Sequence, residues 1–134
     1  MKMKRAIVLT AVVLLLSLFV LVIHASRRDI DLIEQDDVIE NIVIRDLRTD
    51  RELTGKNIDA ILKGVKCRWT SRDYEQTTSL DSYSFEITIY LNKYTKRWHL
   101  MVGQQSYCYE SAGAFNEYTV LNADLLDKIT EAVK

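Results

Sequence analysis

The sequence predicts an α+β protein with an N-terminal transmembrane helix, followed by a twisted antiparallel sheet of about five strands with two helices packed on one face. Three observations predict this fold. Residues 6–23 form an uninterrupted apolar run without a charge. Residues 83–91 alternate strictly between apolar and polar side chains, which is the period of a half-buried strand. Residues 58–65 and 125–133 repeat apolar side chains at helical spacing, so we expect both helices to cover the apolar face of the sheet.

The apolar run at residues 6–23 decides where the rest of the chain lies. Its 18 residues make about 27 Å of helix, close to the ~30 Å hydrocarbon core of a bilayer. Lys2, Lys4 and Arg5 precede the run, and positive charges hold that end in the cytoplasm. We therefore predict that residues 1–28 are a cytoplasmic tip and a transmembrane signal anchor, and that the remainder of the chain lies outside the cytoplasm.

A cleaved secretory signal is the alternative interpretation of the same segment. Ala25 then precedes the cleavage site, with Ile23 two positions earlier. A typical signal core is about 7 to 15 residues long, shorter than this run, so a retained anchor is favoured. The protein is expected to be a single-pass protein of the cell membrane in the first case and a secreted protein in the second.

Charge is divided sharply along the chain. Residues 1–28 carry five of the 18 basic residues and none of the 19 acidic ones, which leaves residues 29–134 with a net charge near −6. An acidic domain repels the phosphates of nucleic acids and anionic lipid headgroups. We therefore predict no nucleic-acid partner, and the part beyond the anchor is long enough for one domain with its own core.

The expected elements follow in order along this exported part. Residues 29–41 are rich in acids and are predicted to form a stalk, so that the folded domain spans residues 42–134. The predicted strands are residues 42–47, 52–53, 67–70, 83–91, 97–102, 105–109 and 115–121, and the two helices have Thr54 and Asn122 as N-caps. A five-residue polar connection after residue 91 favours an antiparallel hairpin between the two strands that it joins.

The two cysteines, Cys67 and Cys108, both lie in the exported part. In an oxidising compartment such a pair most often forms a disulfide, which requires a separation typical of neighbouring strands. The alternative is a pair of buried thiols that act as small apolar side chains.

Catalysis has one candidate pair, His99 with Cys108 as a nucleophile. His99 alternates with the apolar Trp98 and Leu100, so its side chain is expected on the solvent face as a structural residue. We therefore assign no catalytic residue. We also predict no metal or cofactor, because the spacings of zinc ligands and of a glycine-rich phosphate loop are not found in the sequence.

Tyrosine side chains are concentrated in the second half of the chain. Tyr90 lies on the polar side of the best strand and Tyr94 at the tip of the following hairpin, so neither has a core role in this scheme. Because amphipathic aromatic side chains are enriched at recognition surfaces, Tyr90 and Tyr94 are the predicted binding residues.

The order of segments also carries a resemblance. The matching segments are the apolar N-terminus, the strand IVIRDL at residues 42–47, the helix start at Leu53 and Thr54, the strand YSFEI at residues 83–87, and the closing helix with Leu125 and Leu126. In this order the chain resembles small uncharacterised membrane-anchored or lipoprotein-like extracytoplasmic domains of Gram-positive bacteria. It differs from the lipoproteins among them because no cysteine lies near the end of its apolar run. The resemblance implies no particular activity.

Three hypotheses about function follow from these patterns. The leading one is a membrane-anchored, extracytoplasmic domain that binds a protein or a component of the cell envelope and has no catalytic activity. The second is a small extracytoplasmic thiol enzyme or hydrolase that uses Cys108 and His99. The third is an accessory subunit of a membrane complex, in which residues 14–19 of the anchor contact another helix.

Overall fold

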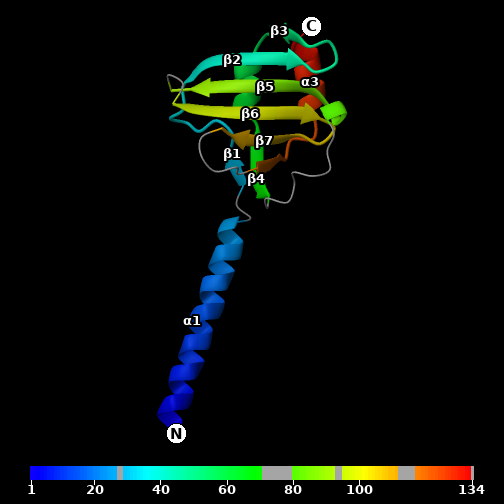
Figure 1. The fold of residues 1–134 in the computed structure, drawn as a ribbon. Coiled ribbons are helices and arrows are strands. Elements are labelled where there is room, and N and C mark those ends of the chain that lie inside the picture. The colour runs from blue at the N-terminus through cyan, green and yellow to red at the C-terminus, as the bar shows by residue number, and fades with distance from the viewer. Residues whose placement is uncertain (27–28, 71–79, 93–94, 112–116, 134) are drawn as a thin grey trace.

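The computed structural model describes residues 1–26, 29–70, 80–92, 95–111 and 117–133. The protein is α+β, with one N-terminal helix, one antiparallel sheet and two short helices on one face of that sheet (Figure 1). The predicted fold class is confirmed. The sheet has eight strands in the described part of the chain, in the order β1-β4-β8-β7-β6-β5-β2-β3, so the prediction of about five strands was too low.

The bounds of the elements are α1 (Lys2–Ser26), β1 (Asp29–Asp31), β2 (Ile39–Asp46), β3 (Arg51–Leu53), α2 (Ile58–Lys63), β4 (Lys66–Thr70), β5 (Tyr83–Leu91), β6 (Lys96–Gly103), β7 (Tyr107–Glu110), β8 (Glu117–Val120) and α3 (Leu125–Ala132). A single turn of 3₁₀ helix at Leu80–Ser82 leads into β5. Seven of these strands overlap strands expected from the sequence, and the strand that was not expected is β1, whose three residues lie in the acidic segment and are too few to show an alternating pattern.

Helix α1 is long and apolar enough to cross a membrane over Lys2–His24, and its apolar window is 0% buried by the rest of the protein. Figure 1 shows it extending away from the sheet. A helix that is apolar on every side is stable where its surroundings are apolar, as in a bilayer. Length and composition therefore suit the predicted membrane span.

The central strand β5 has the alternation that its sequence predicts. Its odd-numbered residues are buried and its even-numbered residues are half-buried. It pairs antiparallel with β6, so that Ile87 lies opposite Leu100 and Thr88 lies opposite His99. The predicted strand at residues 83–91 and the predicted hairpin are therefore confirmed.

The acidic segment 29–41, expected as a stalk, is part of the sheet domain in the structure. β1 pairs with β4 at the edge of the sheet. Leu32 and Ile33, which follow β1, are 0% and 5% exposed and belong to the hydrophobic core. The sequence did not predict their burial, because two adjacent apolar residues among acidic ones fit neither a strand period nor a helix period.

Both helices begin later than their predicted N-caps. α2 begins at Ile58 and has Asn57, with a φ of 58°, as its N-cap residue, whereas Thr54 lies in the preceding loop. Similarly, α3 begins at Leu125 after Asp124. Several residues of the right type stand before each helix, and tertiary packing decides which one precedes the first turn.

Asn122, the predicted cap of the last helix, has a different structural role. Its side-chain oxygen accepts a hydrogen bond from the Lys66 backbone N–H (2.8 Å), and its amide nitrogen donates one to the Gly64 carbonyl (3.0 Å). One side chain thus joins the end of β8 to the connection between α2 and β4.

The core lies between the sheet and the two helices. The buried helix residues are Ile58, Leu62, Leu125 and Ile129, and they join one cluster with the buried residues of the sheet. In that cluster the fully buried side chains of the central strands are Ile87, Ile89, Leu91, Leu100 and Val102. The helices therefore cover one face of the sheet and leave its other face uncovered by them.

Candidate functional site

The uncovered sheet face, which we call the open face, is the candidate site. Strand register places on it the side chains that point away from α2 and α3. On the central strands these residues are Asn41, Val43, Arg45, Tyr83, Glu86, Thr88, Tyr90, Arg97, His99, Met101, Tyr107, Tyr109, Glu117 and Thr119. Figure 1 views this face, with both helices behind the strands.

An aromatic cluster occupies the middle of the open face. His99 of β6 and Tyr109 of β7 are cross-strand partners, and their rings stack with centroids 4.8 Å apart and an interplanar angle of 14°. Tyr107 stacks on Tyr109 at 6.2 Å. Tyr83 contacts the ring of Tyr107 edge to face at 5.3 Å. Because each ring restrains the next, the cluster is a rigid aromatic surface.

Tyr90 and Arg97 extend this surface towards the β5–β6 connection. They are cross-strand partners, and the Arg97 guanidinium lies 4.6 Å from the centroid of the Tyr90 ring. Tyr90 is therefore on the open face, as its place in the alternation predicts. Tyr94, the other predicted binding residue, lies outside the described residues.

The phenols of the cluster are neutral at physiological pH. Burial raises the pKa of Tyr107 to about 12, and the neighbouring phenols Tyr83 and Tyr109 and the charges of Glu117 and Glu86 act in the same direction. Burial, followed by the charges of the same two glutamates, also raises the pKa of Tyr109. Both side chains therefore carry a hydroxyl that can donate a hydrogen bond.

His99 is held in its neutral form. Burial lowers the pKa of its imidazole and outweighs the opposing effect of the Glu86 carboxylate, while Arg97 adds to the lowering. Within the described part of the chain, its Nδ1 is buried without a hydrogen-bond partner. A neutral ring stacked on Tyr109 presents aromatic surface, which suits recognition better than proton transfer.

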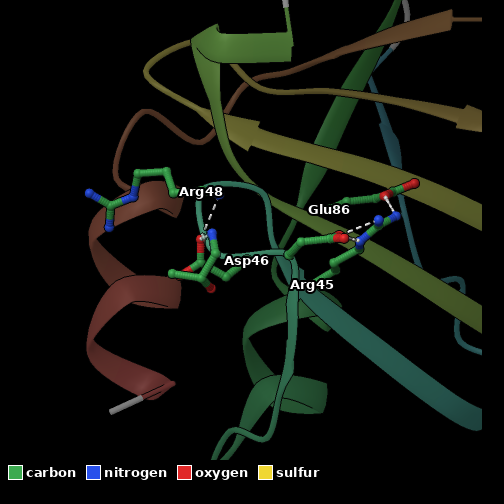
Figure 2. A network of polar contacts seen from close by, with 6 residues as sticks. Arg45, Asp46, Arg48 and Glu86 are labelled. Atoms are coloured by element: carbon green, nitrogen blue, oxygen red, sulfur yellow. Dashed lines mark hydrogen bonds and ion pairs between the residues drawn. The ribbon is translucent and has the colours of Figure 1, made fainter.

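A charged network borders the open face where β2 turns into β3. Arg45 pairs with Asp50 through its Nη2 and lies 3.8 Å from Glu86 of β5 (Figure 2). The turn itself is held by Asp46, whose carboxylate accepts hydrogen bonds from the backbone N–H groups of Arg48 (2.8 Å) and Thr49 (3.3 Å). The bond from Arg48 is the main reason why the pKa of Asp46 lies below its usual range. The network holds Arg45 on the open face between Asp50 and Glu86.

The two cysteines lie on the opposite side of the sheet, in the core. Cys67 and Cys108 are 0% exposed, and their sulfurs are 3.3 Å apart without a bond between them. The expectation of neighbouring strands was wrong, because β8 lies between β4 and β7. The hydrogen bond with Cys67 and burial both raise the pKa of the Cys108 thiol, which keeps it protonated.

The structure does not bring Cys108 and His99 together. Cys108 lies opposite Leu100 and points into the core, whereas His99 lies opposite Tyr109 on the open face. The two side chains lie on opposite faces of the sheet, so they cannot act together as a nucleophile and its base in this arrangement. Among the described residues, no group of three or more His, Cys, Asp or Glu is placed to hold a metal ion.

A groove of about 770 Å³ lies on the helix side, between the loop before α2 and the last turns of α3. Lys56, Lys128 and Glu131 line it. Lys128 already pairs with Asp124 at 3.1 Å, and the remaining charges have mixed sign. The groove offers no convergent set of groups comparable with the aromatic cluster.

The sequence pattern placed His99 on the side away from the core, and it could not bring Tyr107 and Tyr109 beside it. They converge because β7 pairs with β6 in the register that sets Tyr109 beside His99. Alternation in each strand gave the facing of every residue, but the pairing of strands was the missing information.

Comparison of the chain with protein-family models, with curated proteins and with solved structures finds no match in any of the three.

Proposed function

We propose that this protein is a membrane-anchored domain outside the cytoplasm that binds a protein or a cell-envelope component through its open face, and that it carries out no chemistry of its own. The single observation that carries the proposal is the aromatic cluster of His99, Tyr107 and Tyr109 on a sheet face that neither helix covers. The apolar, fully exposed α1 supports the anchor. Three basic residues at the start of α1, Lys2, Lys4 and Arg5, support the orientation.

The composition of the open face supports a protein partner. Protein interfaces are enriched in aromatic residues, methionine and arginine and depleted in lysine. The central strands present tyrosine, histidine and arginine on this face, whereas their lysine, Lys96, contacts the Trp98 ring from the start of β6. Rigid tyrosines lose little conformational entropy on binding, so they favour affinity.

The edges of the sheet support binding on the face over the addition of a strand. The edge strands β1 and β3 have three residues each and carry charged side chains at two of the three positions. Short, charged edges resist pairing with another chain. A partner therefore meets the side chains of the open face, where the aromatic cluster lies.

Photocrosslinking in intact cells tests the binding proposal. A photoreactive amino acid in place of Thr88, at the centre of the open face, is expected to give a discrete adduct. The matched control replaces Lys63, an exposed residue of α2 on the other side of the molecule, and is expected to give none. Digestion of the adduct with protease or with a glycan hydrolase identifies its class. Equal yields at both positions, or no adduct at Thr88, would contradict the proposal.

Export also bears on the cysteine pair, for which we propose a disulfide in the mature protein. A disulfide oxidant takes two electrons and two protons from the thiols, and the sulfurs close from 3.3 Å to a bond of about 2.05 Å. The loop spans 41 residues, for which the loss of unfolded-state entropy corresponds to roughly 4 kcal/mol of stability. Because β8 lies between the two strands, these strands must move closer together for the bond to form.

Thiol labelling of the exported protein tests this disulfide. Protein taken from the membrane, denatured in an alkylating reagent without reductant, is expected to take up no label. The same sample reduced first is expected to take up two labels, one on each cysteine. Uptake of two labels without reductant would show a pair of free thiols and would contradict the bond.

A further inference from the structure

Trp69 is exposed at the end of β4, although tryptophan side chains are usually well buried. It is 42% exposed, whereas Trp98 in the core is 3% exposed. Its backbone pairs with Tyr118 of β8, and its side chain lies on the same face of the sheet as that of Cys67. The indole therefore lies at an edge of the domain with much of its ring uncovered.

The connection to α1 places this edge beside the membrane. α1 ends at Ser26 and β1 begins at Asp29, which pairs with Arg68 of β4. β4 runs antiparallel to β1, so Trp69 lies one step beyond Asp29 in the direction from which α1 arrives. Three residue steps join Ser26 to Asp29, which span at most about 11 Å.

We propose that Trp69 inserts into the headgroup layer of a zwitterionic lipid surface and fixes the β1–β4 edge of the domain on the membrane. This inference rests on the proposed membrane anchoring by α1. Tryptophan is enriched at membrane–water interfaces because its ring is apolar and its N–H needs a polar partner.

The charges around this edge fit a neutral lipid surface. Arg68 pairs with Asp29 at 2.9 Å, and Lys66 pairs with Asp31 at 3.5 Å. The charges of these paired side chains cancel locally, so the two pairs neither repel nor require anionic headgroups. Phosphatidylcholine, which has no net charge, is therefore the chosen probe surface.

This contact sets the direction of the open face. With β1 and β4 on the membrane, the strand order puts β3 at the far edge of the sheet (Figure 1). The open face then stands upright from the bilayer, and a partner reaches it from the side along the membrane surface.

Fluorescence quenching by brominated phosphatidylcholine tests the inference. The full chain is reconstituted into vesicles with and without bromine on the upper acyl chains, and tryptophan emission is compared. The wild type is expected to lose emission in the brominated vesicles. The fractional loss is expected to be several-fold smaller in Trp69→Phe, which retains only the buried Trp98. Equal losses in the two proteins would overturn the inference.

A second variant controls for orientation, and flotation separates the two proposals. Trp69→Phe combined with Arg51→Trp puts an indole on β3 at the far edge, where emission is expected to be unchanged by bromine; a loss there equal to that of the wild type would contradict the inference. If the protein fails to float with the vesicles, the membrane anchor itself is wrong. If it floats and the wild type is not quenched, the anchor stands and the placement of Trp69 is wrong.

Discussion

Ile87→Ala is expected to lower the free energy of unfolding by about 2 to 5 kcal/mol, the range for truncation of a buried isoleucine. Ile87 is 0% exposed and lies at the centre of the sheet, opposite Ile44 of β2 and Leu100 of β6. The truncation leaves a cavity that the neighbouring strands cannot fill. Urea unfolding of the full chain in detergent micelles, followed by tryptophan fluorescence, measures the loss.

Thr88→Ala is the matched control for that truncation. Thr88 is the next residue of the same strand and lies opposite His99 on the open face. Its side chain is half-buried and outside the core, so the change is expected to stay within about ±0.5 kcal/mol. If both substitutions lowered the free energy of unfolding equally, the face that carries Thr88 would be buried as well as the face that carries Ile87, and the assignment of the open face would be wrong.

This pair of substitutions depends on the part of the structure that the sequence predicts best. Alternation needs only neighbouring residues, so the facing of residues 85–91 follows from the sequence alone. Tyr83 is the exception, because a register shift between Tyr83 and Phe85 turns its ring towards Tyr107 on the open face. The same rule placed His99 away from the core and Cys108 opposite in facing to Tyr107 and Tyr109, and the structure agrees. Facing is a local property, and local properties can be read from one sequence.

Strand order is not a local property, and the sequence did not predict it. The strands β4, β7 and β8 have four or five residues each, and nothing in their composition states which one lies in the middle. The structure puts β8 between the other two. The cysteines were expected on adjacent strands because a disulfide was assumed, and no strand order was available to test that assumption. For the same reason the aromatic cluster of His99, Tyr107 and Tyr109 could not be assembled before the pairing was known.

Helix starts and the acidic segment failed for a related reason. Thr54 and Asn57 are both acceptable N-cap types. The loop between them is held against α3, because the Lys56 N–H donates a hydrogen bond to the Ala132 carbonyl (3.1 Å). Similarly, Leu32 is held by a hydrogen bond from its N–H to the Val65 carbonyl (3.0 Å). In each case a partner distant in sequence decides the local structure, which a pattern within one segment cannot contain.

Gly103→Ala is expected to destabilise the protein by about 1 to 3 kcal/mol, the usual cost of overpacking. Gly103 ends β6 and pairs with Tyr83, and a Cβ there would lie 2.4 Å from the Ser82 carbonyl oxygen and 3.1 Å from the Tyr83 ring. The first neighbour is backbone, so the start of β5 must shift to relieve the clash. Urea unfolding measures the cost.

The expected shift at the start of β5 also affects the aromatic cluster, which distinguishes this clash from a general loss of stability. The Tyr83 ring contacts Tyr107 of the aromatic cluster, so Gly103→Ala is expected to reduce crosslinking from position 88 under conditions where the variant is folded. Gly64→Ala is the matched control, because a Cβ there meets its nearest neighbour, the Ile61 carbonyl oxygen, at an ordinary 3.5 Å. With a φ of −88°, that position accepts alanine, which is expected to be neutral or to stabilise the protein by up to about 1 kcal/mol. If the two glycine substitutions had equal effects on unfolding and on crosslinking, close packing at Gly103 would not support the aromatic cluster.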